Sequence, residues 1–207
     1  MGGGSGVDSV ALARRGGLAT LLDYSEAALA AARTTARREG MTIQLVGADA
    51  HRMPFGDGSF DAVFHQGFLE HFRDPMPILV EQRRVLKRVG VLLVDVPQKY
   101  SFYTLEKRRK IREGTWFAGW ETEYSLGELE RLVAAAGFQV VRTFGRDLQP
   151  FLARIRSLSA AGTRRIGRPY LPRKVAHLYD RVWSFLESRR TVYRFCLSVG
   201  VVARRPG

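Results

Sequence analysis

Cysteine is nearly absent from this 207-residue chain, in which Cys196 is the only one. One thiol cannot form an intramolecular disulfide or a thiolate zinc site, so a disulfide-stabilised domain and a zinc finger are excluded. Long apolar runs are missing as well, because the stretch at 89–96 ends at Pro97, far short of the roughly 18 residues that span a bilayer. The opening MGGGSGV lacks the basic and apolar parts of a signal peptide. We therefore expect a cytoplasmic protein.

Acidic residues are scarce only in the last part of the chain. The net charge is +13, yet residues 1–150 hold 20 Lys and Arg against 18 Asp and Glu, whereas residues 151–207 hold 13 against 2. Such asymmetry indicates an anionic partner, either a membrane surface or a nucleic acid, or else a solvated basic surface. These interpretations stay open at this point.

Apolar residues make up 45% and charged residues 26% of the chain, a composition typical of one folded domain of this length. Short apolar runs alternate with segments of helical period. We expect helices near 7–15, 25–40, 74–90 and 125–137, and strands at 18–23, 41–49, 58–67, 91–97, 138–144 and 195–206. Apolar strands that alternate with helices predict an α/β, doubly wound and mostly parallel sheet.

Two segments interrupt this alternation within the single domain 1–207. Residues 98–124 mix aromatic and basic side chains, as an inserted lid over a site would. Residues 150–190 show helical spacing and many Arg residues, which predicts a helical basic insertion before the last strand. We expect that last strand to close the sheet in the antiparallel direction.

The opening glycines are the first candidates for a binding site. Gly2, Gly4 and Gly6 alternate directly before a helix, where a tight turn and free N–H groups suit a nucleotide-like cofactor, although a flexible leader has the same composition. Asp23, at the end of the next strand, suits a ribose diol. An NAD(P)-dependent oxidoreductase is the alternative, but its G-x-G-x-x-G pattern requires glycine where this chain has Val7.

The stretch GADAHRMPFGDGSFDAV at 47–63, followed by the two helix–strand segments described above, is the most specific pattern in the chain. With it, residues 2–145 resemble the class I S-adenosylmethionine-dependent methyltransferases, in particular the small-molecule group related to the ubiquinone and menaquinone methyltransferases. The resemblance implies a Rossmann-like fold, S-adenosyl-L-methionine as cofactor, and methyl transfer to a small-molecule or lipid-linked acceptor. It implies no metal.

The resemblance also assigns roles at the cofactor. Gly2, Gly4 and Gly6 would form the loop beside its methionine moiety. Asp23 would bind the ribose hydroxyls, and Tyr24 would flank the adenine.

Further residues are assigned in the same way. Asp49 would accept the adenine amino group, with the backbone of Ala50 beside it. His65 and Gln66 would line the sulfonium end. His71, in the segment FLEHF, is the candidate general base for an acceptor that must lose a proton; packing under the following helix is its alternative.

One departure from the family pattern concerns the start of the chain. Members have a strand immediately before the glycine loop, whereas this sequence begins at Met1. That strand would lie at the centre of the sheet, so we expect two neighbouring strands without a partner. The hypothesis is a chain that lacks its first strand and folds poorly or binds cofactor weakly.

The acceptor pocket is expected to form from residues 98–124 and 150–190. Tyr103, Trp116 and Trp120 suit an apolar or ring-shaped molecule, and the neighbouring basic residues suit a lipid head group or RNA. We do not expect a nucleic-acid partner, because no RNA-binding motif is visible. Peripheral contact with the inner face of the membrane through the basic C-terminal third is compatible with the charge. A non-catalytic basic domain that binds membrane or nucleic acid remains the other alternative.

Overall fold

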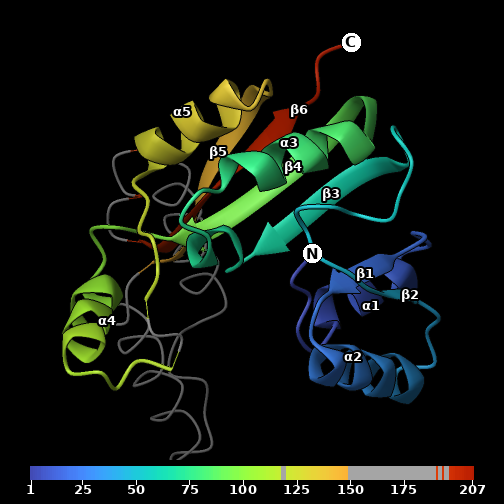
Figure 1. Cartoon of the computed structure of the whole chain (residues 1–207), viewed down its shortest axis with the longest axis horizontal. Helices are drawn as coiled ribbons and strands as arrows, with labels where there is room; N and C mark the ends of the chain where they lie inside the picture. Colours follow the sequence, from blue (N-terminus) through green and yellow to red (C-terminus); the bar gives the residue numbers. More distant parts are fainter. Residues whose placement is uncertain (118–119, 149–189, 191–192, 194–195) are drawn as a thin grey trace, which may run out of the picture.

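The structure is a computed structural model that describes residues 1–117, 120–148, 190, 193 and 196–207 (Figure 1). The helical insertion expected at 150–190 therefore lies almost wholly outside the described residues. Among the described residues, no helix combines the length and apolar character that crossing a bilayer requires.

The N-terminal part is a small βαβ unit with one extra helix. After α1 (Val7–Arg14) come β1 (Thr20–Asp23), α2 (Glu26–Arg38) and β2 (Gln44–Gly47), and the two strands pair in parallel. The Ser25 hydroxyl accepts a hydrogen bond from the N–H of Ala28 at 3.3 Å and so caps α2, as the sequence predicts. A core of Leu21, Leu29 and Ala32 holds α2 on the two strands.

The larger sheet has the order β3-β4-β6-β5. Its strands are β3 (Phe60–Gln66), β4 (Leu86–Pro97), β5 (Gln139–Leu148) and β6 (Cys196–Arg204). β3 pairs in parallel with β4, and β6 runs antiparallel to both β4 and β5, which confirms the antiparallel closing strand. α3 (Met76–Val85) and α5 (Leu126–Ala135) lie across one face of this sheet (Figure 1).

The main core lies between these two helices and the larger sheet. It includes the fully buried side chains of Ile78, Leu92, Leu129 and Val201. Gly200 marks its tightest point, because a Cβ there would lie 2.6 Å from the Val94 carbonyl oxygen and 2.2 Å from the ring of Phe144. The cluster around Leu21 is separate from this main core, but Leu22 of β1 belongs to the main core and so links the two sheets through side-chain packing.

The boundary between α3 and β4 differs from the expectation. Helical spacing predicts a helix to residue 90, but α3 ends at Val85 and β4 begins at Leu86. Leu86 is buried opposite Phe60, its partner in β3. Val89 has φ 58°, and its N–H donates to the Arg205 carbonyl oxygen at 3.1 Å. Pairing of Leu86 and Val89 with distant parts of the chain therefore ends the helix earlier than the local spacing of apolar residues predicts.

The two sheets meet at β1 and β3 without forming a ladder with each other. The first two residues bridge these edges by backbone hydrogen bonds: the Met1 amine donates to the Phe64 carbonyl oxygen at 3.0 Å, and the Gly2 N–H donates to that of Leu22, also at 3.0 Å.

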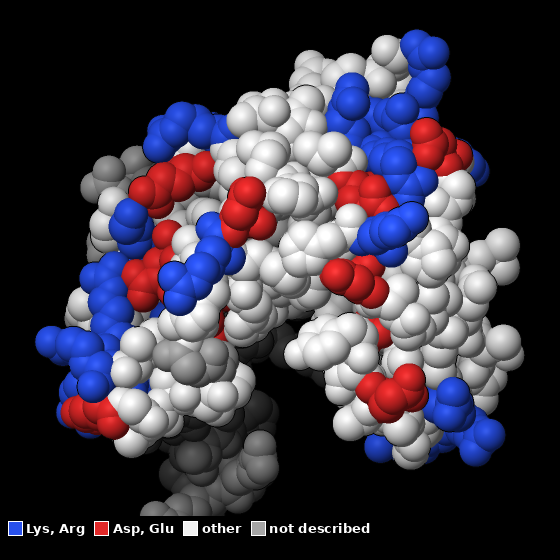
Figure 2. All heavy atoms as spheres, viewed as in Figure 1, with Lys and Arg blue, Asp and Glu red and all other residues white. Residues whose placement is uncertain are grey.

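The inserted segment 98–124 contains α4 (Phe102–Arg112). Its two ends meet where the Lys99 N–H donates to the Tyr124 carbonyl oxygen at 3.0 Å. Four of the five basic residues of α4 form ion pairs with Glu side chains, for example Arg108 with Glu123, and blue and red atoms accordingly lie side by side over α4 (Figure 2). The described part of the insertion therefore presents a mixed surface rather than a basic one.

Candidate functional site

A cavity of about 500 Å³ lies where the carboxyl ends of β1, β2 and β3 come together. This is the edge at which open parallel sheets generally bind ligands. Its lining comes from the glycine loop, the ends of the three strands, the turn after β3 and the inserted segment: Gly2, Gly4, Leu22, Asp23, Tyr24, Ala48, Asp49, Ala50, Gly67, Phe68, His71, Phe72 and Trp120.

The glycine loop requires glycine for two different reasons. Gly2, Gly4 and Gly6 all have positive φ, at 56°, 47° and 74°, which side chains rarely adopt. A Cβ on Gly2 would also lie 2.3 Å from the ring of Phe68, whereas a Cβ on Gly4 would meet nothing within 4 Å. Gly4 therefore leaves its backbone open to the cavity. α1 follows directly without a side-chain cap, so its first N–H groups stay available for an anionic group.

The two predicted carboxylates belong to the same cavity. Asp23 ends β1, where it is 8% exposed and accepts a hydrogen bond from the Ser25 N–H at 3.0 Å. Asp49 follows β2, and its Oδ1 accepts the His51 N–H at 2.9 Å and lies 2.8 Å from His51 Nδ1. These contacts with His51 lower the pKa of Asp49. Parallel pairing of β1 with β2 brings the carboxyl ends of the two strands together, and with them the two carboxylates. Each carboxylate can accept hydrogen bonds from a ligand in the cavity.

Aromatic rings form one wall of the cavity. The Phe68 and Phe72 rings are 4.9 Å apart in an edge-to-face arrangement, and His51 makes a similar contact with Phe72. Tyr24, next to Asp23 in the chain, also lines the cavity and is 84% exposed. Flat walls of this kind suit a purine or another planar ring.

Three predicted residues do not line the cavity. Gly6 caps α1, where a Cβ would lie 2.8 Å from that of Ala32, so packing of α1 on α2 accounts for this glycine. His65 is 1% exposed beneath the Phe68 ring, and burial lowers its pKa to about 3, with a further contribution from the Met1 ammonium. Gln66 accepts a hydrogen bond from Arg146 Nη1 at 3.1 Å. Their roles in cofactor binding stay predictions.

His71 lines the cavity, whereas its neighbour Glu70 turns away from it. Both belong to the short 3₁₀ turn η1 (Leu69–His71) after β3. Glu70 is 2% exposed, and its Oε2 has no hydrogen-bond partner among the described residues. Burial raises the pKa of Glu70 to about 7, and the nearby carboxylate of Glu121 raises it further, while Lys107 lowers it.

The inserted segment is anchored to η1 and supplies one wall residue. The Thr122 N–H donates to the Glu70 carbonyl oxygen at 2.8 Å, and the buried ammonium of Lys107 lies 2.9 Å from the Glu121 carboxylate. Trp120 reaches the cavity, with the Arg73 guanidinium 4.7 Å from its ring centre. This part of the insertion therefore forms a side of the site, as a lid would.

A second cavity of about 230 Å³ shares Gly67 with the first. Its lining includes Asp95, Tyr103, Arg146 and Ser198. Asp95 is 2% exposed and lies 3.1 Å from the Arg146 guanidinium. No three His, Cys, Asp or Glu side chains cluster as metal ligands in the part of the chain that the structure describes.

The aromatic wall was missed by reasoning from the sequence. Phe68 and Phe72 flank His71 in the segment GFLEHF, and this closeness to a candidate base was the available signal. Trp120 was expected only in an acceptor pocket. It lines the cavity because of how the inserted segment folds back, for which the sequence carries no local signal.

Comparison with known proteins agrees with this geometry. A family described as "Methyltransferase domain" matches residues 1–94. The demethylmenaquinone methyltransferase of Clavibacter sepedonicus is 36% identical over 91 residues, which cover 44% of this chain and 37% of that protein. Residues 1–94 thus form a methyltransferase domain, and the matched relatives include a probable S-adenosylmethionine-dependent methyltransferase of Mycolicibacterium smegmatis, 31% identical over 145 residues, which cover 70% of this chain and 51% of that protein. The chain spans between about a third and a half of the length of the first curated relatives that it matches.

Solved structures support the methyltransferase fold. A SAM-dependent methyltransferase from Thermotoga maritima superposes with a TM-score of 0.66 at 19% identity, covering 99% of this chain and 79% of that one. Magnesium protoporphyrin IX methyltransferase from Synechocystis PCC 6803, solved with bound SAH, gives 0.64 at 16% identity, covering 99% and 71%. The doubly wound Rossmann-like class is thereby confirmed.

The methyltransferase cavity fits the family's cofactor, S-adenosyl-L-methionine. Its volume lies within the usual range for ligands of this size. Asp23 and Asp49 would bind the ribose and the adenine, Phe68 and Phe72 would face the planar ring, and the open backbone at Gly4 leaves room for the amino-acid tail.

Replacing Asp23 tests this assignment. In Asp23→Asn one charged acceptor is lost, so we expect S-adenosylhomocysteine to bind about 10- to 150-fold more weakly in a calorimetric titration. Asn keeps an oxygen for the Ser25 N–H, which limits damage to α2. The control is Asp61→Asn, because Asp61 is exposed beside Lys87 and outside the cavity. Equal affinity of the two variants would contradict the role of Asp23.

The buried carboxyl of Glu70 predicts a pH-dependent stability. Its folded-state pKa of about 7 lies above the ordinary 4.5, so the folded state binds the proton more tightly than the unfolded state does. Stability should therefore fall as pH rises from about 5 to about 8, by on the order of 3 kcal/mol from this group. Glu70→Gln should lose that dependence, which urea unfolding across this range measures. Parallel curves for the variant and the native chain would exclude the effect.

Proposed function

We propose that this methyltransferase transfers a methyl group from S-adenosyl-L-methionine to a small-molecule or lipid-linked acceptor. One observation carries the proposal: the open glycine loop and the carboxylates of Asp23 and Asp49 line a single cavity of suitable volume. Residues that are far apart in sequence thus supply complementary groups for the cofactor's sugar, base and tail.

The bound cofactor supplies a methyl group made electrophilic by a positively charged sulfur. A nucleophilic atom of the acceptor would take this methyl group, and the electrons of the carbon–sulfur bond would stay on sulfur. The chain's contribution is chiefly to orient the reactants, an effect that can supply roughly 7 to 11 kcal/mol. A proton must leave only when the acceptor group carries one, and His71 is the cavity residue that can accept it.

A planar acceptor suits the walls around Gly67. Trp120 and Phe68 line the first cavity, and the second cavity continues from Gly67 towards Tyr103. Demethylmenaquinone methyltransferases are among the matched relatives, and their names indicate a quinone-type substrate for those proteins. We propose that a molecule of this class lies across the two cavities, with its reacting atom near Gly67.

We place the protein in the cytoplasm, with peripheral contact to the inner face of the membrane. The support is the composition of residues 151–207, which contain 13 Lys and Arg residues and only two acidic residues. Basic segments of this kind favour anionic lipid surfaces. A lipid-linked acceptor would then be available at the membrane, and co-sedimentation with anionic vesicles examines this contact.

Isotopic labelling tests the function directly. The protein is incubated with an extract and a methyl donor carrying a labelled methyl group, and the lipid and aqueous fractions are analysed separately. We expect label in a small molecule or lipid with the native chain and with Asp61→Asn, and strongly reduced label with Asp23→Asn. Label in protein or RNA would overturn the acceptor class, and no label in any fraction would favour a non-catalytic cofactor-fold domain.

His71 is tested by its effect on turnover. If its imidazole removes the acceptor's proton, His71→Ala should lower turnover by about 10²- to 10⁴-fold while S-adenosylhomocysteine binds as before. Single-turnover rates with the labelled acceptor, measured beside calorimetry, separate the two effects. Unchanged turnover would show that His71 does not accept the proton and only lines the cavity.

A further inference from the structure

Arg146 of β5 is held in place at the second cavity by side chains from the three other strands of its sheet. Its Nε lies 3.1 Å from the Asp95 carboxylate of β4 and donates to the Ser198 hydroxyl of β6 at 3.4 Å. Its Nη1 donates to the Gln66 side chain of β3 at 3.1 Å. Strand pairing places Gln66 beside Asp95 and, two strands away, Ser198 beside Arg146. The guanidinium is therefore oriented in advance of ligand binding.

The held guanidinium also lines the second cavity. The Arg146 side chain is 46% exposed, and the apolar part of the same lining comes from Pro97 and Leu197. A guanidinium carries five N–H donors and no acceptor. The ligand group that Arg146 can bind in this cavity is therefore an oxygen or another hydrogen-bond acceptor.

Asp95 decides which oxygens fit beside Arg146. Asp95 is almost fully buried, and a buried carboxylate requires a compensating charge. Arg146 supplies that charge, so the pair as a whole is neutral. A carboxylate or phosphate on a ligand would compete with Asp95 for the same cation and leave buried negative charge uncompensated. A neutral carbonyl or hydroxyl oxygen accepts a hydrogen bond from Arg146 without this cost.

Tyr103 of α4 supplies a second donor to the cavity. Burial raises the pKa of Tyr103, and the carboxylates of Glu121, Glu70 and Glu106 raise it further. The phenol therefore keeps its proton at neutral pH and can donate it to an oxygen of the ligand.

We propose that the second cavity binds a carbonyl or hydroxyl oxygen of the methyl acceptor through Arg146 and Tyr103, and that the Asp95–Arg146 pair selects a neutral acceptor over an anionic one. The inference rests on the proposed function, because it takes this cavity as part of the acceptor site. Gly67 borders both cavities, so a ring held by its oxygen in the second cavity meets the cofactor cavity there. Asp95 acts through Arg146 and is a positioning residue.

Two naphthoquinones of nearly equal size serve as probes of this selection. Menadione is neutral, whereas lawsone carries an acidic hydroxyl and is an anion at neutral pH. Each probe is titrated calorimetrically into the full chain saturated with S-adenosylhomocysteine, so that the cofactor cavity is occupied. We expect the native chain to bind menadione at least about tenfold more tightly than lawsone, because only lawsone competes with Asp95 for the guanidinium.

Substitutions separate the roles of the pair. Asp95→Asn leaves the guanidinium charge uncompensated, so lawsone should bind about tenfold more tightly while menadione binds as before. Arg146→Gln shortens and neutralises the donor, so menadione should bind about 10- to 150-fold more weakly. If Arg146→Gln does not fold because Asp95 loses its partner, the double variant with Asp95→Asn removes both charges and measures the same loss. The matched control is Arg142→Gln, because Arg142 is an exposed arginine of β5 outside both cavities, and it should change neither affinity.

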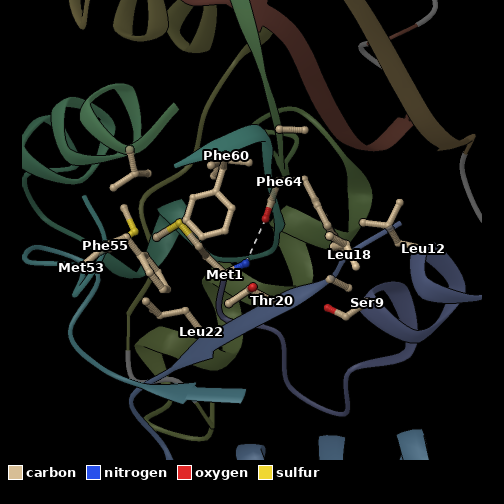
Figure 3. Close-up of a pocket in the computed structure, with 14 residues that line it drawn as sticks. Met1, Ser9, Leu12, Leu18, Thr20, Leu22, Met53, Phe55, Phe60 and Phe64 are labelled. Atoms are coloured by element: carbon tan, nitrogen blue, oxygen red, sulfur yellow. Dashed lines mark hydrogen bonds between the residues drawn. The ribbon is translucent and has the colours of Figure 1, made fainter. Parts of the chain in front are cut away.

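An apolar groove between β1 and β3 is the other place where a naphthoquinone could bind. Leu12, Phe55 and Phe60 belong to its walls, and the Met1 side chain lies beside Phe60 (Figure 3). Among the described residues that line it, none has a charged side chain. Binding in this groove would not respond to substitution of Asp95 or Arg146, so the variants report on the second cavity.

Each outcome decides for or against the selection. A native chain that binds lawsone as tightly as menadione, or that binds neither probe, would overturn the proposal, as would an unchanged lawsone affinity in Asp95→Asn. Equal menadione affinity in Arg146→Gln and Arg142→Gln would exclude Arg146 from the acceptor site. The titrations involve no methyl transfer. Discrimination between the probes without any labelled acceptor would therefore contradict the proposed function, whereas a labelled acceptor without discrimination would contradict the charge selection alone.

Discussion

Two adjacent backbone hydrogen bonds, from Met1 to Phe64 and from Gly2 to Leu22, hold the two sheets of this protein together at their facing edges. The same bonds place the glycine loop at the carboxyl ends of β1 and β3. Because Gly4 then opens into the cavity, the join between the sheets and the binding of the cofactor depend on one short segment. Each of these hydrogen bonds contributes only about 0.5 to 1.5 kcal/mol of stability in net terms.

The inserted segment ties the other side of the site to the larger sheet. The buried Lys107–Glu121 pair and the backbone bond from Thr122 to Glu70 bring Trp120 to the cavity. A buried pair of this kind is costly to break, since the fully buried Lys107 ammonium would keep only the longer contact with Glu123, at 3.9 Å. The lid is thereby coupled to η1, which also carries His71.

Sequence reasoning was most successful where the signal is local. Ser25 and Ser125 cap helices as predicted, because a hydroxyl followed by helical residues satisfies free N–H groups by itself. It was wrong about the end of α3, because pairing of Leu86 with Phe60 depends on residues 26 positions away. His65 was expected at the cavity, but the alternation of β3 turns its side chain into the interior.

The sequence by itself determined the types and order of the elements other than α4, the glycine turn, and the acidic residues at the ends of β1 and β2. These features depend on side-chain period and on backbone freedom at neighbouring positions. Only the tertiary structure decided which aromatic rings line the cavity with Asp23 and Asp49, and that Glu70 is buried. Each of those outcomes depends on contacts between segments distant in the chain, for which a single sequence carries no local signal.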